Sequence, residues 1–76
     1  MKKKPDKKFL KALGKRIRVL RKQQDDMSQD QLAFEVGIRR EQIIRIEAGT
    51  QNTSIDIVKK IADVFEIPLK ELVDFE

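Results

Sequence analysis

Four side chains between positions 40 and 45 have the chemistry needed to read the edges of DNA bases. Arg40 and Arg45 each carry a planar guanidinium that can donate two parallel hydrogen bonds to O6 and N7 of guanine. Glu41 can accept a hydrogen bond from N4 of cytosine, and Ile44 can contact the methyl group of thymine. At about 100° per residue, the four side chains fall within about 140° of one another on a helix. The pattern therefore predicts four base-contacting residues and a DNA site that contains G·C pairs.

Each of these side chains also has a simpler explanation. Arg40 and Arg45 can form a solvated charged face or contact phosphates instead of bases. Glu41 lies four residues before Arg45, where it can form an ion pair within the helix. Ile44 can be an isolated exposed apolar residue. At the level of sequence, both explanations stay open.

The element that must present these side chains is the second helix of a helix-turn-helix, over about residues 40–48. Ala33 is small where two helices cross closely, and Gly37 can take the positive φ that ends the first helix of the motif. Ile43 and Ile46 fix the second helix against the core. This arrangement leaves the opposite face free to enter a DNA major groove.

Helical periodicity along the rest of the chain predicts an all-α fold, a compact bundle of five helices. The first helix is expected over about residues 6–24, with an apolar stripe at three- and four-residue steps. Ser28 and Ser54 are expected to cap the second and fourth helices, and Gly49 to end the third. Pro68 can begin a short fifth helix. The stripe of the first helix consists of Phe9, Leu10, Leu13, Ile17 and Leu20.

Length and charge favour one small domain that binds a polyanion. The chain has 76 residues, enough for a single modest core. Residues 1–22 contain eleven Lys or Arg and one Asp, and the remainder contains six basic and twelve acidic residues, so the two parts carry +10 and −6. We expect residues 1–8 to form a flexible basic N-terminal arm and residues 9–76 a single domain. The arm either contacts phosphates or is a disordered tail that improves solubility.

Composition also argues against several classes of function. The chain has no Cys and no His, so it lacks a thiolate or imidazole for a metal site and also lacks a Cys nucleophile and a His base. A chain this short has little room for a pocket that excludes water from reacting carboxylates. No apolar run reaches the ~20 residues of a membrane helix. We therefore expect no enzyme activity, no cofactor, no metal and no membrane partner, and a cytoplasmic location.

Three segments of the sequence resemble a known family. They are SQDQLA at 28–33, VGIRREQIIRIEAG at 36–49 and IVKKIADVFEIPLKEL at 57–72. Together they are similar to the lambda-repressor-like, Cro/C1-type (XRE) helix-turn-helix domain of bacterial and phage regulators. The resemblance implies a sequence-specific transcriptional regulator that binds double-stranded operator DNA. In that family the base-contacting positions correspond to Arg40, Glu41 and Arg45.

Phosphate contacts are expected on both sides of these base-contacting residues. In the family that the sequence resembles, the position of Gln29 binds the DNA backbone. Arg39 occupies the cap position of the third helix, where the family favours a hydroxyl or a short acid, and this can place a cation beside a phosphate. Asn52 can instead form a hydrogen bond within its own loop. The expected phosphate contacts are Gln29, Arg39, Gln42, Gln51, Asn52 and Thr53.

The resemblance also implies a structural ion pair between Arg21 and Glu47. This pair would tie the first helix to the end of the third. Reversal of the Arg21 charge should then lower stability. Alternatively, Arg21 can present one N–H group to a phosphate.

The C-terminal segment 67–75 is expected to mediate a homodimer. A single module of this size reads only a few base pairs, so useful affinity usually comes from a two-fold dimer on a palindrome. Leu69, Leu72, Val73 and Phe75 are more apolar residues than a short helix needs to close a core. If all of them pack internally, the protein is a monomer instead.

The biological setting has several alternatives. Small size and the stretch GTQNTSIDI make the chain similar to controller proteins of restriction-modification operons, while antitoxins and phage regulators share the same module. A different class is a protein-interaction module that uses the third helix or the C-terminal face, with DNA binding secondary. We expect no small-molecule effector, because sensing usually requires a second domain.

Overall fold

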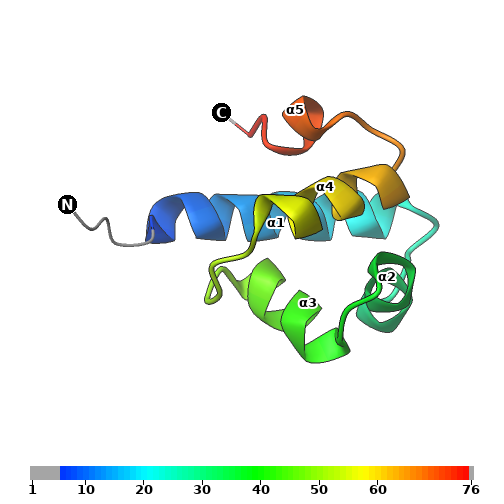
Figure 1. The fold of residues 1–76 in the computed structure, drawn as a ribbon. Coiled ribbons are helices and arrows are strands. Elements are labelled where there is room, and N and C mark those ends of the chain that lie inside the picture. The colour runs from blue at the N-terminus through cyan, green and yellow to red at the C-terminus, as the bar shows by residue number, and fades with distance from the viewer. Residues whose placement is uncertain (1–5, 76) are drawn as a thin grey trace.

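The computed structural model describes residues 6–75, and within this range the chain forms five helices and no strands (Figure 1). The predicted all-α, five-helix fold is therefore confirmed. Of the expected N-terminal arm, residues 1–5 lie outside the described residues, whereas Lys7 and Lys8 already belong to the first helix. The helices are α1 (Lys7–Gln23), α2 (Gln29–Val36), α3 (Arg40–Ala48), α4 (Ile55–Val64) and α5 (Leu69–Leu72).

Three of the helices begin at a side chain that accepts a hydrogen bond from the first turn. Asp6 accepts from the backbone N–H of Phe9 at 3.0 Å, which starts α1. Ser28 and Ser54 do the same for α2 and α4, with distances of 3.0 and 3.3 Å. These contacts satisfy N–H groups that have no partner within the helix. Both predicted serine caps are confirmed.

Residues with a left-handed backbone conformation end α2 and α3. Two further residues with this conformation lie in the turn between α1 and α2. Gly37 has φ +86° and Gly49 has φ +73°, as expected for glycines that close helices. Asp25 and Asp26 also have positive φ, at 58° and 57°. Aspartate tolerates this conformation better than most residues because its short side chain can hydrogen-bond locally. The chain therefore reverses from α1 into α2 without a glycine.

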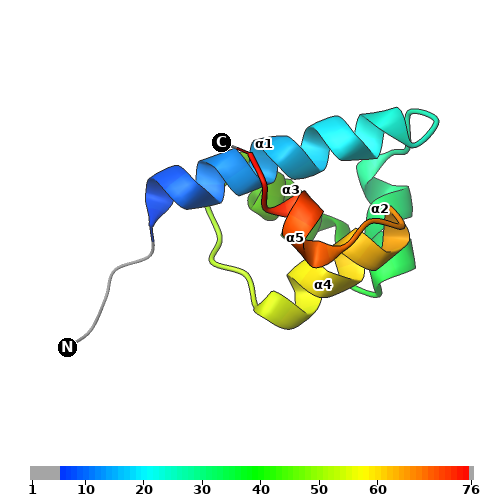
Figure 2. The same cartoon turned by 90° about the horizontal axis from the view of Figure 1, so that it is seen from above.

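Figure 1 shows α2 and α3 along the lower edge of the molecule and α5 along the upper edge. Seen from above, in Figure 2, α5 lies between α1 and α4, and it contacts both. Apolar side chains from all five helices meet in the interior, so the domain has one continuous core. Its buried members are Leu13, Ile17, Leu20, Leu32, Ala33, Val36, Ile43, Ile46, Val58, Ile61, Ala62, Phe65 and Leu72.

Two glycines allow α1 and the end of α3 to approach closely. A Cβ atom placed on Gly14 would lie 2.4 Å from the carbonyl oxygens of Ile46 and Glu47, too near for any side chain. A Cβ atom on Gly49 would lie 2.6 Å from Cα of Lys11. The absence of both side chains therefore lets the C-terminal end of α3 rest directly on the backbone of α1.

The C-terminal segment packs mainly onto the domain itself. Leu72 is fully buried, and the four other apolar side chains of the segment are half-buried against the core. The ring of Phe75 lies 5.4 Å from that of Phe9, centroid to centroid, which returns the chain end to the start of α1. Arg16 adds a hydrogen bond from Nη2 to the backbone oxygen of Glu71 at 3.1 Å. The half-buried side chains are Ile67, Leu69, Val73 and Phe75.

Candidate nucleic-acid interface

One face of α3 is buried and the other is open, as a DNA-reading helix requires. Ile43 and Ile46 are almost completely buried in the core. The side chains predicted to contact bases all lie on the exposed face, and α3 lies at the lower edge of the molecule in Figure 1. A partner as wide as a DNA duplex therefore has free access to this face. The exposed residues are Arg40, Glu41, Ile44 and Arg45.

Both arginines on this face are held by side chains from neighbouring elements. Nε of Arg40 lies 3.5 Å from Oδ1 of Asp30 in α2. Nη1 of Arg45 donates to Oε1 of Gln51, in the loop after α3, at 3.3 Å. Arg45 therefore contacts Gln51, in place of the ion pair with Glu41 that helical spacing allows. Glu41 keeps an exposed carboxylate on the same face.

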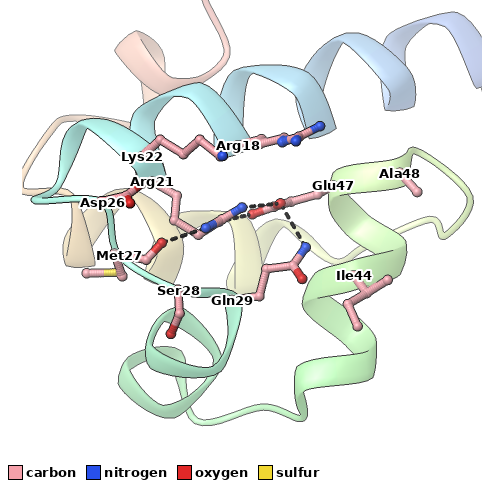
Figure 3. Close-up of a pocket in the computed structure, with 10 residues that line it drawn as sticks. All are labelled: Arg18, Arg21, Lys22, Asp26, Met27, Ser28, Gln29, Ile44, Glu47 and Ala48. Carbon is pink, nitrogen blue, oxygen red and sulfur yellow. Dashed lines mark hydrogen bonds and ion pairs between the residues drawn. The ribbon is translucent and has the colours of Figure 1, made fainter.

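Ile44 borders an open groove between α1, the start of α2, and α3, shown in Figure 3. It is 37% exposed, so its side chain is available at the surface but is also supported by its neighbours. Arg18 and Lys22 line the opposite side of the groove on α1. The groove therefore combines an apolar group on α3 with positive charge on α1, which suits a polyanion.

A buried ion pair between two residues that line this groove joins α1 to α3. Nε and Nη2 of Arg21 donate to the two carboxylate oxygens of Glu47 at 2.7 and 3.0 Å (Figure 3). Nη1 of Arg21 donates to the backbone oxygen of Met27 in the α1–α2 link. The two side chains are only 8% and 4% exposed. This cluster fixes the C-terminal half of α3 relative to α1.

Gln29 belongs to the same cluster. Its Nε2 donates to Oε1 of Glu47 at 3.0 Å (Figure 3). One of its amide N–H groups is therefore used inside the protein, and the side chain is half-buried. At the other end of the motif, Oε1 of Gln42 accepts from the backbone N–H of Arg39 at 3.2 Å. Gln42 thus supports the start of α3, while the Arg39 guanidinium, which has no acceptor atom, stays exposed.

The loop after α3 presents its polar side chains in different directions. Gln51 binds Arg45, and Asn52 is exposed. Oγ1 of Thr53, in contrast, is buried and has no hydrogen-bond partner. The Thr53 hydroxyl is therefore not exposed in this structure, and a contact between Thr53 and a phosphate stays a prediction. Thr53 also lines an apolar groove, together with Leu13 and Val58 among others.

Two features of the structure escaped the sequence analysis. Asp30 was not singled out, although a carboxylate in the first turn of α2 is a good candidate to face an arginine on the next helix. Gly14 was not singled out either, although a glycine inside an otherwise strong helical pattern often marks a close packing contact.

Residues 6–75 contain no group of three or more acidic side chains that could hold a metal ion. Across the same residues, no helix is both long enough and apolar enough to cross a membrane.

Comparison with known proteins identifies close similarity to DNA-binding regulators. Residues 17–72 match the family model HTH_3, described as helix-turn-helix. The control protein C.BamHI of Bacillus amyloliquefaciens is 40% identical over 62 residues, which are 82% of this chain and 76% of that protein. An HTH-type transcriptional regulator of Archaeoglobus fulgidus is 42% identical over 50 residues, 66% of this chain and 71% of the relative. The crystal structure of the restriction-modification controller protein C.AhdI from Aeromonas hydrophila superposes with a TM-score of 0.78 at 35% identity, covering 83% of this chain and 94% of the controller.

Proposed function

The chain belongs to the Cro/C1-type (XRE) helix-turn-helix family of DNA-binding transcriptional regulators, and on that premise we propose that it binds a palindromic operator as a homodimer. The observation that carries the proposal is the division of α3 into two faces. Its inner face is buried in the core, and its outer face presents two arginines, a glutamate and an isoleucine to solvent. In this proposal α3 enters the major groove and these four side chains contact bases.

The chemistry of the outer face favours an operator half-site with G·C pairs. Arg40 and Arg45 each donate a pair of hydrogen bonds to guanine. Glu41 accepts from cytosine, and Ile44 contacts a thymine methyl group. The carboxylate of Glu41 does not pair with Arg45, because Arg45 donates to Gln51 instead. That contact supports a base-reading role for Glu41.

Phosphate contacts flank this face in the proposal. Arg39 and Asn52 are exposed at the two ends of α3. Gln29 and Gln42 each use one side-chain atom within the protein, and their remaining amide N–H groups supply the contact to a phosphate. Gln51 contributes through its own amide nitrogen, since its oxygen is bound to Arg45. These contacts fix the position of the domain on the duplex but carry no sequence information.

The dimer surface that we propose is centred on the exposed part of the segment 67–75. Phe75 stacks against Phe9, which is itself 43% exposed. Next to them Val73 and Phe9 line an apolar groove together with Ile55, which is 68% exposed. A second copy that covers these side chains removes apolar surface from water, which is the main driving force for association. A two-fold dimer also supplies the second α3 that a palindrome requires.

The biological role that we propose is control of a restriction-modification operon. The similar protein C.AhdI is a restriction-modification controller protein, and C.BamHI is named as a control protein. Binding of the protein to DNA upstream of its own gene, with a nuclease or methyltransferase gene alongside, would support this setting. A toxin gene alongside would point to an antitoxin instead.

Selection from a randomised duplex library tests the function directly. At about 150 mM salt the attraction between isolated surface charges and phosphates is substantially screened. We expect enrichment of a palindrome that contains G·C pairs. If no sequence is enriched and binding disappears as salt rises, α3 does not read bases and a protein-interaction module becomes the better explanation.

A further inference from the structure

We propose that Asp30 and Gln51 are positioning residues that orient the base-reading arginines before DNA is bound. Asp30 holds Arg40, and Gln51 holds Arg45. The inference rests on the proposed function, in which both arginines contact bases. It adds two residues that lie outside α3, one in the helix before it and one in the loop after it.

The contact of Asp30 leaves the outer end of the Arg40 guanidinium free. Oδ1 of Asp30 faces Nε of Arg40 at 3.5 Å, and Nε is the guanidinium nitrogen nearest the aliphatic chain. The two terminal nitrogens, Nη1 and Nη2, are left to donate a parallel pair of hydrogen bonds. That pair matches O6 and N7 of guanine. A carboxylate bound at Nε therefore selects an end-on approach of Arg40 to a base.

The contact of Gln51 leaves a different edge of Arg45 free. Oε1 of Gln51 accepts from Nη1 at 3.3 Å. Nε and Nη2 then remain as a parallel pair along the side of the guanidinium. Gln51 lies in the loop that follows the left-handed residue Gly49 at the end of α3. Arg45 is thereby set for a side-on approach to a base.

Orientation before binding matters because both arginines are exposed. The side chain of Arg40 is 58% exposed and that of Asp30 is 75% exposed, so without a partner Arg40 would sample many rotamers. An arginine that is already restricted loses less conformational freedom when it binds a base. It also aligns with one base pair in preference to its neighbours. The two contacts are therefore expected to improve selectivity more than overall affinity.

Asp30 carries a negative charge on the DNA-facing side, and this makes its role measurable. Removal of any carboxylate near DNA weakens repulsion from phosphates and raises affinity for all sequences. Removal of a residue that orients Arg40 also lowers the preference at one base pair. Glu35, another exposed carboxylate of α2, provides the matched control because its Oε2 accepts a hydrogen bond from Gln31. Asp30→Ala and Glu35→Ala each remove one carboxylate from α2, and only the first removes the partner of Arg40.

The test compares base preferences selected from a randomised duplex library by the wild type and the variants at the same salt concentration. Asp30→Ala should lower, by about threefold, the preference at the base pair whose selection is lost in Arg40→Ala, since exposed pairs of this kind contribute modestly. Glu35→Ala should leave every preference unchanged. Asp30→Asn, which keeps an acceptor oxygen, should retain more of the preference than Asp30→Ala. Gln51→Ala should act in the same way on the base pair read by Arg45, with Gln23→Ala, at the exposed end of α1, as its control.

The outcomes separate failure of this inference from failure of the proposed function. If Arg40→Ala loses a base preference and Asp30→Ala keeps it at the wild-type level, Asp30 does not position Arg40. If the double variant Asp30→Ala/Arg40→Ala loses more preference than Arg40→Ala alone, Asp30 acts independently of Arg40 and the inference is also wrong. If Arg40→Ala itself keeps every preference, the assignment of Arg40 as a base-reading residue fails. Thermal unfolding of each variant, expected to match the wild type closely, shows that a lost preference does not reflect a lost fold.

Discussion

Removal of the Glu47 carboxylate should destabilise the protein far more than loss of an exposed ion pair. The Glu47 side chain is 4% exposed and accepts two hydrogen bonds from Arg21 and one from Gln29. In a Glu47→Ala variant the Arg21 guanidinium stays buried, and the backbone oxygen of Met27 is the partner that remains. A buried charge that loses its partner in this way costs about 3–5 kcal/mol.

This cost is large relative to the stability of a small domain. Domains typically unfold with a free energy of about 5–15 kcal/mol, so Glu47→Ala removes a substantial share of it. For 60–100 residues, each kcal/mol lowers the thermal midpoint by at least about 4 °C. A loss of about 3 kcal/mol therefore predicts a midpoint at least about 12 °C lower. Urea unfolding followed by circular dichroism gives the free energy directly.

Three further variants show whether the buried charge is the cause. Glu47→Gln keeps the shape and one acceptor oxygen, so its loss should be smaller than that of Glu47→Ala. The double variant Arg21→Met/Glu47→Leu removes both charges and should recover much of the stability. Lys59→Ala breaks an exposed pair with Asp63 and should cost less than about 1 kcal/mol. A Glu47→Ala variant as stable as Lys59→Ala would refute the reasoning.

Three other predictions test the reading face, the packing of α3 and the dimer. Combined replacement of Arg40 and Arg45 by Ala should abolish selective operator binding in a gel-shift assay. The thermal midpoint should stay within a few degrees of the wild type, because both side chains are exposed. Continued selection of the same operator would contradict their role. Gly14→Ala should lower the free energy of unfolding by about 3 kcal/mol, since its Cβ meets backbone carbonyl groups of α3; an equally stable variant would show that the two helices are not in close contact there. Ile55→Lys should shift a dimer toward monomer in sedimentation equilibrium. Phe34→Lys, at a more exposed apolar residue on α2, should not. Equal effects of the two variants would argue against the proposed dimer surface.

Helix boundaries were predictable because they depend on local chemistry. A hydroxyl at Ser28 or Ser54 can satisfy free N–H groups only at the start of a helix. A glycine at position 37 or 49 adopts a left-handed conformation at low cost, and both positions end helices in the structure. The buried face of α3 followed from helical spacing alone, which placed Ile43 in the core. Each of these predictions needed only neighbouring residues.

Features that depend on distant residues were harder to predict. Gly14 packs against the end of α3, and Asp30 faces Arg40 across two helices, so the local sequence does not say which partner each residue contacts. Thr53 lies in a polar stretch, but its hydroxyl is buried in the structure. The apolar residues at 67–75 suggested a dimer surface, and the structure buries Leu72 completely and leaves the other apolar side chains of the segment half-buried. The environment of each of these residues depends on its three-dimensional neighbours, which residue type alone does not give.

The packing contact at Gly14 does not involve the side chains that we propose to read DNA. Gly14 meets main-chain atoms of α3, so this packing does not depend on which side chains α3 carries. The side chains of Arg40, Glu41, Ile44 and Arg45, in turn, are not part of the buried core. In the proposed function, a few codon changes on the outer face can therefore give this domain a new target sequence while the scaffold stays the same. Duplicated copies of such a gene can diverge in target without first passing through an unstable intermediate.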